Sequence, residues 1–285
     1  MKIGLMFTNT GALSQPDLIA HLATTSDQCG IESMWTIEHV AIPQGFQTPY
    51  PYSRDGKFPG GETAPILDPL IPLSFCASIT KKLKFATAVV ILPQRHPIYI
   101  AKQLATLDVL SGGRVMFGIG SGWLKEEFAA LQLDFKERGA RTDESIAAIR
   151  ALWRDDPATF QGKHFNFRGM KSFPNPLQKD GIPIHVGGHS PAAVRRAARL
   201  GDGFFPAPGN LNVLKDLFGK LREECAKIGR NPAEIELSAA GRLTPDLIKT
   251  FQDMGVSRAM TIPPGGDRDS LSRGLEKLGN ELAHL

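Results

Sequence analysis

The sequence predicts an α/β protein built as a (β/α)8 TIM barrel, with eight parallel strands in a closed ring. Short segments rich in apolar, β-branched and aromatic residues recur along the chain, and a stretch with apolar residues at helical spacing follows each of them. Strands that alternate with helices form right-handed crossovers and a parallel sheet. An open doubly wound sheet is the main alternative, but eight such units in 285 residues fit a closed barrel better.

The predicted strands are nearly continuous apolar runs, as expected of strands that are buried on both faces. In chain order they cover residues 3–7, 33–37, 84–90, 114–119, 182–187, 203–206, 234–240 and 258–262. The spacing of apolar residues predicts helices between them, over 17–29, 97–110, 143–153, 191–200 and 211–228. Two longer intervals, at about 41–64 and 155–181, are predicted as insertions within a single domain of residues 1–285. We expect a small hairpin in the second insertion.

Composition and charge exclude several classes of protein. A hydrophobic fraction of 42% is typical of a globular protein, and no apolar run approaches the length of a membrane span. The first residues run directly into the first strand, so we expect a cytoplasmic protein without membrane contact. The net charge is +4, but Lys and Arg are dispersed among acidic residues. Nucleic-acid binding is therefore not expected, whereas a small anionic ligand is compatible with the charge.

The three cysteines do not indicate a disulfide framework or a metal site. Cys29, Cys76 and Cys225 are odd in number, widely spaced and without a CxxC motif. We predict that each is a small core residue, and that the protein holds no metal.

The loop after the fifth predicted strand has the features of a phosphate site. Gly187 and Gly188 allow a close approach of the backbone to a ligand, and Ser190 is a good N-cap for the helix that follows. Free N–H groups at a helix start favour an anion. Gly187, Gly188, His189 and Ser190 are therefore the predicted phosphate cradle. An ordinary strand-to-helix turn is the alternative, and barrels more often bind phosphate after strands seven and eight.

A glycine-rich segment follows the fourth predicted strand. Its spacing is G-x-G-x-G over residues 118–122, which differs from the dinucleotide fingerprint G-x-G-x-x-G. We interpret these glycines as bringing Ser121, Gly122 and Trp123 against a flat or phosphorylated ligand. Trp123 is equally compatible with a packing role on the barrel rim.

His39 lies just beyond the second predicted strand, at the end of the barrel where catalytic groups gather. A histidine titrates near neutrality and can transfer a proton beside a redox centre, although a lone histidine is more often structural. The long loop that follows contains Tyr50, Tyr52 and Phe58. These rings are candidates for substrate contact, and a loop that merely plugs the barrel mouth would have the same composition.

With these segments in place, the chain resembles the luciferase-like monooxygenase superfamily, and more closely its deazaflavin (coenzyme F420)-dependent oxidoreductase branch. The resemblance covers about the first 210 residues. It rests on the linked set of motifs WTIEHV (35–40), ATAVVILP (86–93), QRHP (94–97), AKQLATLD (101–108), SGGR (111–114), GIGSGW (118–123), EEF (126–128), RGAR (138–141), ALW (151–153), VGG (186–188), RAAR (196–199) and GDG (201–203).

The resemblance implies a tricyclic flavin or deazaflavin ring at the carboxyl mouth of the barrel, with the cofactor phosphate on the loop after strand five. His39 would contact the cofactor or transfer a proton at its reactive side. A non-proline cis peptide bond between Ala88 and Val89, in a bulge on the third strand, would support the back of the ring. The resemblance also implies a homodimer.

Three functions remain open at this point. The first is hydride transfer between coenzyme F420 and a small organic substrate. The second is an FMN-dependent monooxygenase, in which a separate reductase supplies the reduced flavin. The third is a non-catalytic flavin-binding barrel. Sugar-phosphate dehydrogenases of the same branch have a glutamate where this chain has Trp123. Their strongly basic substrate pocket is not evident in this sequence either, so we do not assign their substrate to this protein. We expect the substrate to contact the loops at Asn9, at 50–58 and after Pro206.

Overall fold

Eight parallel strands form a closed barrel in the computed structural model, which describes residues 1–53, 55–206 and 210–282. The strands follow the order β3-β2-β1-β11-β10-β9-β8-β5, and pairing between β3 and β5 closes the ring. The predicted fold class is therefore confirmed. The barrel strands are β1 (Lys2–Met6), β2 (Ser33–Thr36), β3 (Lys84–Thr87) with its continuation β4 (Val90–Ile91), β5 (Val115–Gly120), β8 (Ile184–Gly187), β9 (Gly203–Phe205), β10 (Glu236–Ala240) and β11 (Arg258–Thr261).

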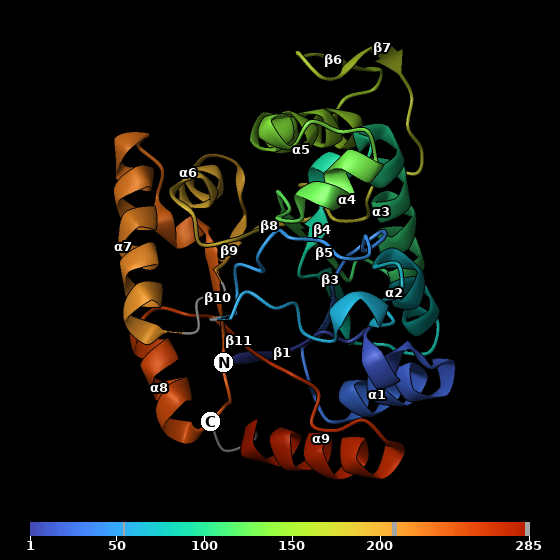
Figure 1. Ribbon diagram of the computed structural model, residues 1–285, viewed down its shortest axis with the longest axis vertical. Helices are drawn as coiled ribbons and strands as arrows, with labels where there is room; N and C mark the ends of the chain where they lie inside the picture. The colour runs from blue at the N-terminus through green and yellow to red at the C-terminus, as the bar shows by residue number, and fades with distance from the viewer. Residues whose placement is uncertain (54, 207–209, 283–285) are drawn as a thin grey trace.

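Helices surround the barrel strands, as Figure 1 shows. The predicted helix over 191–200 has the bounds expected from its sequence, whereas that over 143–153 begins earlier, because its first turn is polar and shows no apolar spacing. The α-helices are α1 (Pro16–Gln28), α2 (Leu70–Ala77), α3 (Pro97–Ser111), α4 (Lys125–Ala130), α5 (Arg138–Arg154), α6 (Pro191–Leu200), α7 (Leu211–Lys227), α8 (Pro245–Asp253) and α9 (Arg268–Leu282). Within the described ranges, none of them is long and apolar enough to cross a membrane.

The third strand differs from its prediction. The sequence indicates one strand over 84–90, but the structure interrupts it between β3 and β4. The Ala88–Val89 peptide bond is cis, as the resemblance implied. Beyond it, Val90 and Ile91 pair with the end of β5. The interruption forms a bulge at the carboxyl mouth of the barrel.

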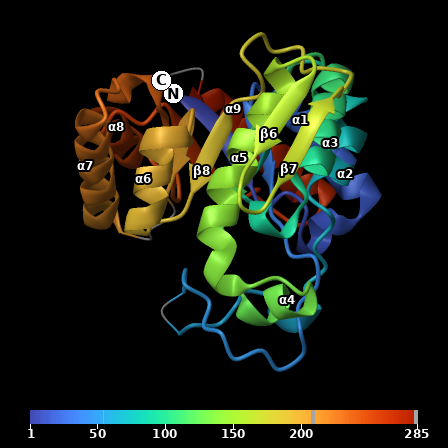
Figure 2. The same cartoon turned by 90° about the horizontal axis from the view of Figure 1, so that it is seen from above.

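The two insertions differ in structure. The second contains the antiparallel hairpin of β6 (Ala158–Gln161) and β7 (Asn166–Met170), which confirms the predicted hairpin. The first is a long loop whose only described helical turn is η2 (Gly61–Thr63). Figure 2 shows this loop beside α4, on the side of the molecule opposite the N-terminus.

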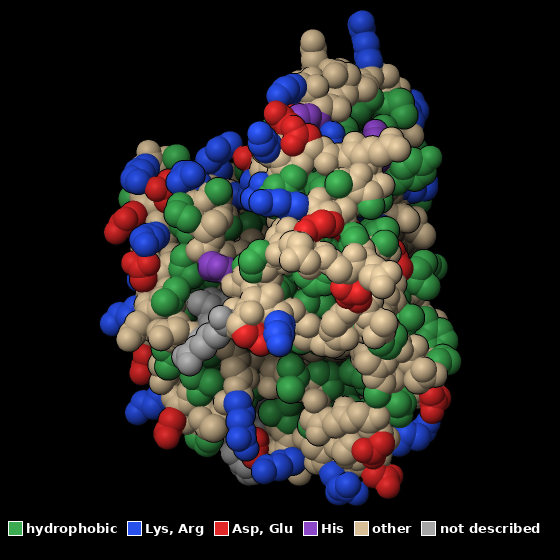
Figure 3. All heavy atoms as spheres, viewed as in Figure 1, with side chains coloured by type: hydrophobic (Ala, Val, Ile, Leu, Met, Phe, Trp, Pro, Cys, Tyr) green, Lys and Arg blue, Asp and Glu red, His purple; other side chains and the backbone are tan. Residues whose placement is uncertain are grey.

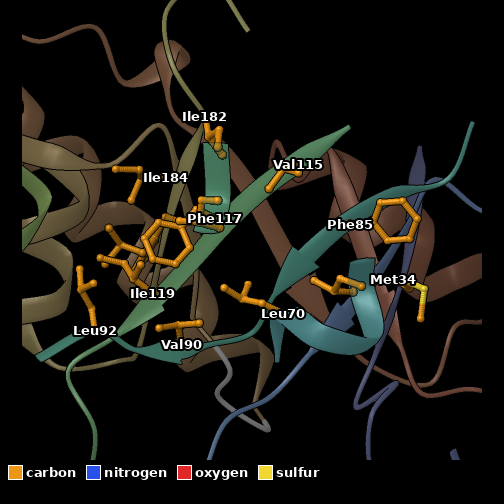
Figure 4. Close-up of a cluster of buried hydrophobic side chains, with 14 of the residues drawn as sticks. Met34, Leu70, Phe85, Val90, Leu92, Val115, Phe117, Ile119, Ile182 and Ile184 are labelled. Atoms are coloured by element: carbon orange, nitrogen blue, oxygen red, sulfur yellow. The ribbon is translucent and has the colours of Figure 1, made fainter. Parts of the chain in front are cut away.

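The core lies mainly between the barrel strands and the helices. Apolar side chains of neighbouring strands point outward there, as Figure 4 shows for Phe85, Val115, Phe117 and Ile184. Cys76 and Cys225 are buried and Cys29 is half-buried, and all three are free thiols. A second cluster inside the barrel is formed by Trp35, Ala86, Met116, Phe205 and Met260.

A buried ion cluster forms the floor of the barrel at the amino ends of the strands. Arg258 is 1% exposed and donates two hydrogen bonds, of 2.7 and 2.8 Å, to the carboxylate of Glu32. It also pairs with Glu236. Burial raises the pKa of Glu32, but the Arg258 guanidinium outweighs it and lowers the pKa to about 2. The charges of the floor are thus compensated within it, and the open space lies at the opposite end of the barrel.

Candidate active site

A pocket of about 1370 Å³ opens at the carboxyl end of the barrel, where strands of this fold present their functional side chains. Apolar side chains are exposed near the centre of this face, and most Lys and Arg side chains lie toward its edge (Figure 3). The loops after β2, β5 and β8 and the bulge after β3 bring together all the predicted site residues. The lining includes His39, Ala88, Val89, Ser121, Gly122, Trp123, Gly187, Gly188, His189 and Ser190.

A buried carboxylate holds the imidazole of His39. Its Nδ1 lies 3.1 Å from Oε2 of Glu127, and the two side chains are 5% and 1% exposed. Burial raises the pKa of Glu127, but hydrogen bonds from His39, Gln94 and the Ala41 amide lower it overall. An ionised Glu127 accepts a hydrogen bond from the N–H group at Nδ1, so Nε2 is the nitrogen left for a ligand in the pocket.

Glu127 is a site residue that the sequence reasoning missed. It lies in the first turn of α4, next to Glu126, and both carboxylates accept hydrogen bonds from the long loop. Glu127 binds the amides of Val40 (2.7 Å) and Ala41 (3.2 Å). Glu126 binds the Thr48 hydroxyl at 2.7 Å. The two adjacent carboxylates after the Gly-rich segment are the only sequence signal of this anchor, which holds the loop across the pocket.

The loop between β8 and α6 fits a phosphate group. The Ser190 hydroxyl caps α6 by accepting the Ala193 amide at 3.2 Å, as predicted. Gly188 has a φ of +106°, which L side chains rarely adopt. Among the described residues, no acceptor pairs with the amide N–H groups of His189 and Ser190. Free N–H groups at a helix start are the donor set that an anion requires.

Two arginines that the sequence reasoning did not assign to the site line the same wall. Arg196 of α6 is 7% exposed and bonds Asp143 and the Gly139 carbonyl. Arg138 lies over the Phe135 ring, 3.8 Å from its centre. Burial lowers the pKa of Arg138, and so does the positive charge of Arg196. A bound anion would relieve this repulsion between like charges, so the arginines support an anion site.

The glycines of β5 and β8 have a role that the sequence did not indicate. A Cβ atom at Gly120 or at Gly187 would lie 2.6 Å from a methyl group of Val89. Both glycines therefore leave room for the Val89 side chain. This role adds to the one expected from the sequence, in which glycines let the backbone come close to a ligand. Val89 and Ala88 form a small apolar surface inside the pocket, which suits the face of a planar ring.

An aromatic cluster covers His39. Phe58 and Trp123 lie 5.0 and 5.6 Å from the imidazole, measured between ring centres, and both are close to perpendicular to it. The Tyr50 ring lies 5.3 Å from Phe58 and 5.2 Å from Trp123. Tyr52 reaches His189 on the cradle loop at 5.1 Å. Trp123 thus packs on the rim and also lines the pocket, so its two interpretations are compatible.

Asn9, in one of the loops expected to contact the substrate, does not itself line the pocket, although Met6 and Phe7 just before it do. Asn9 is completely buried, and its side-chain amide donates to the carbonyls of Ile37 (2.8 Å) and Leu67 (2.7 Å). It holds the loops after β1 and β2 together because a buried amide must be satisfied by such partners. Of the other expected substrate loops, residues 50–53 and 55–58 are described and include pocket-lining side chains. Residues 207–209, directly after Pro206, lie outside the described residues.

The sequence of this chain matches a protein family and several known proteins. A family model described as "Luciferase-like monooxygenase" matches residues 1–246. An uncharacterized protein of Mycobacterium tuberculosis is 32% identical over 89% of this chain and 87% of its own length. An F420-dependent glucose-6-phosphate dehydrogenase of Rhodococcus erythropolis is 32% identical over 78% of this chain and 62% of that protein. An FMNH2-dependent dimethylsulfone monooxygenase of Pseudomonas putida is 35% identical over 53% of this chain and 42% of that protein.

A solved structure has the same fold. A monooxygenase from Streptomyces bottropensis superposes with a TM-score of 0.75, and the match covers 100% of this chain and 99% of that one. Its sequence identity is 21%, so the likeness concerns the fold alone. Relatives of this chain thus include both F420-dependent and FMN-dependent proteins.

Proposed function

Because the chain belongs to the luciferase-like monooxygenase family, we propose that it is an oxidoreductase that transfers a hydride between coenzyme F420 and a small organic substrate. The observation that carries the proposal is the presence in one pocket of an anion cradle and an imidazole held by a buried carboxylate. The cradle suits the cofactor phosphate, and the imidazole suits the proton that accompanies hydride transfer.

The residues of the pocket have distinct roles in this proposal. Gly187, Gly188, His189 and Ser190 bind the phosphate, and Arg138 and Arg196 add positive charge. Ala88 and Val89 support the back of the ring, and Ser121 and Gly122 line its side. When bound, the cofactor supplies a carbon centre that accepts or donates a hydride.

Proton transfer is assigned to His39. Glu127 accepts the hydrogen bond from Nδ1 and fixes the orientation of the ring. Nε2 then takes a proton from a substrate hydroxyl, or returns it to a carbonyl oxygen, according to the direction of the reaction. Phe58 and Trp123 pack against the imidazole and against each other, and they keep water away from that side of it.

FMN is the second candidate cofactor. The same cradle, bulge and histidine suit its phosphate and ring, and the reaction would then use oxygen and a reductase that supplies reduced flavin. Coenzyme F420 is preferred because the F420-dependent relative matches 78% of this chain, whereas the FMNH2-dependent relative matches 53%. A non-catalytic flavin-binding barrel is the third possibility, and it gives no reason for the buried carboxylate that orients His39.

Parallel titration of the cofactor-free protein with oxidised coenzyme F420 and with FMN tests the choice of cofactor. Quenching of tryptophan fluorescence is a suitable signal, because Trp123 lines the pocket. We expect coenzyme F420 to bind at least about tenfold more tightly, a difference of roughly 1.4 kcal/mol. Tighter binding of FMN would reverse the assignment and favour oxygen chemistry with a partner reductase.

We also expect the protein to form a homodimer. The outer surface of α2 and the turn after it exposes three large apolar side chains at a spacing of four residues, Ile71 (69% exposed), Phe75 (46%) and Ile79 (43%). Apolar patches of this kind are typical of protein interfaces. Light scattering should give twice the mass of the chain, and the variant Phe75→Glu should give the monomer mass. A monomeric wild-type protein would contradict this expectation.

A further inference from the structure

We infer that the substrate is a flat, uncharged, largely apolar molecule, such as a conjugated ring ketone or the corresponding alcohol, that packs against Tyr50, Phe58 and Trp123 beside His39. This inference rests on the proposed function, which requires a cofactor and a substrate in the same pocket. It adds the chemical class of the second occupant and the residues that select it.

The size of the pocket leaves room for two ligands. Sites for a single small molecule usually have volumes of roughly 300–1,000 Å³. The pocket here measures about 1370 Å³. A cofactor whose phosphate lies on the cradle and whose ring lies against Val89 therefore leaves space on the side of the long loop, where the aromatic rings are.

The rings of this cluster present apolar surface next to the proposed proton-transfer group. Tyr50, Phe58 and Trp123 all line the pocket, and each contacts the other two. Aromatic rings attract one another in tilted and edge-to-face arrangements at centre distances of about 4.5–7 Å. The five ring pairs among these three residues and His39 all have such geometry. A further planar ring would be bound by the same forces within reach of His39.

The charges of the pocket lie elsewhere or are already compensated. Arg138 and Arg196 line the cradle wall, and Glu38 is paired with Arg95 at 2.5 Å. Burial raises the pKa of Tyr50 to about 12, so its hydroxyl is neutral throughout the physiological range. Arg242, Lys277 and Glu281 also line the pocket, but all three are exposed. Arg242 comes from the loop after β10, and Lys277 and Glu281 of α9 pair with each other at 3.9 Å. The aromatic wall itself thus offers no ionised partner to a charged substrate.

The loop that supplies Tyr50 and Phe58 is fixed on both sides of the pocket. Glu126 accepts the Gln47 and Thr48 amides, and Tyr52 contacts His189 on the cradle loop. An aromatic wall that is held at both ends presents its rings in a preformed arrangement, which lowers the entropy that a ligand must lose on binding. The wall is therefore suited to recognise shape as well as apolarity.

Calorimetric titration with three probes of similar shape tests the inference. The probes are 2-naphthol, which is neutral, 2-naphthoate, which is an anion, and N-methylquinolinium, which is a cation. Each is titrated into the protein loaded with whichever cofactor binds and, separately, into the cofactor-free protein. We expect 2-naphthol to bind at least about tenfold more tightly than either charged probe, and the variants Tyr50→Ala and Phe58→Ala to weaken it by about tenfold.

Two further variants separate recognition from damage to the fold. Tyr50→Phe keeps the ring and should bind 2-naphthol within about twofold of the wild type. Phe46→Ala is the matched control, because Phe46 contacts Trp123 in the same loop cluster but does not line the pocket. It should also leave the affinity nearly unchanged.

Other results would overturn the inference. Tighter binding of 2-naphthoate would assign the substrate side to the exposed cations, and tighter binding of the quinolinium would indicate an aromatic cage for a cation. Equal binding by wild type and Tyr50→Ala would remove the aromatic wall from recognition. The titrations with F420 and FMN report on the proposed function separately: failure of both cofactors to bind would end that proposal, whatever the probes show.

Discussion

Substitution of His39 by alanine should lower turnover by about 10²–10⁴-fold, the usual range for loss of a positioned general acid or base. Nε2 of this residue is the nitrogen that remains available in the pocket, because Nδ1 is bonded to Glu127 at 3.1 Å. Cofactor affinity should change much less, since we propose that the cradle and the two arginines bind the phosphate. The measurement is turnover of an aromatic alcohol or ketone, followed by the absorbance of the cofactor, with the cofactor titration in parallel.

Two companion measurements separate proton transfer from a structural effect. Imidazole added to the His39→Ala protein should restore part of the activity, because the deletion leaves space for it beside Phe58 and Trp123. Glu127→Gln should lower turnover less than His39→Ala and alter its pH profile, since the amide cannot carry the negative charge that fixes the imidazole. Unchanged turnover in His39→Ala would remove this residue from the mechanism.

Substitution of Gly188 by valine should weaken cofactor binding by at least about 100-fold, or roughly 2.7 kcal/mol. The φ of +106° at this position is one that β-branched residues avoid, so the cradle backbone must move to accept the new side chain. A Cβ atom there would also lie 3.3 Å from the Cβ of Ala193 in the first turn of α6. Equilibrium titration with the preferred cofactor measures the loss.

Gly255→Val is the matched control for the cradle variant. Gly255 has a φ of +80°, with no atom within 4 Å of the added Cβ, and it follows α8 outside the residues that line the pocket. Both variants place valine in an unfavourable backbone conformation, so both should lower the melting temperature, but only Gly188→Val should lose the cofactor. Wild-type affinity in Gly188→Val would defeat the assignment of the cradle.

Local sequence features determined much of the architecture. Eight apolar runs mark the eight barrel strands because a parallel strand buried on both faces admits few polar side chains. Ser190, Pro191 and Gly201 predict the bounds of α6, since capping depends on residues that are adjacent in sequence. The loop between β8 and α6, which we propose as the phosphate cradle, was predictable for the same reason: its glycines and its helix start lie within one short segment.

Only the tertiary structure decided which distant residues meet. Glu127 orients His39 across 88 positions of sequence, and no local pattern links the two. The side chain of Val89 occupies the space left by Gly120 and Gly187, which belong to two other strands. Tyr52 reaches His189 because closure of the barrel brings the loops after β2 and β8 to the same mouth. The spacing of apolar residues and the capping residues predict how each segment folds by itself. The contacts between distant residues depend on the strand order and register that close the ring.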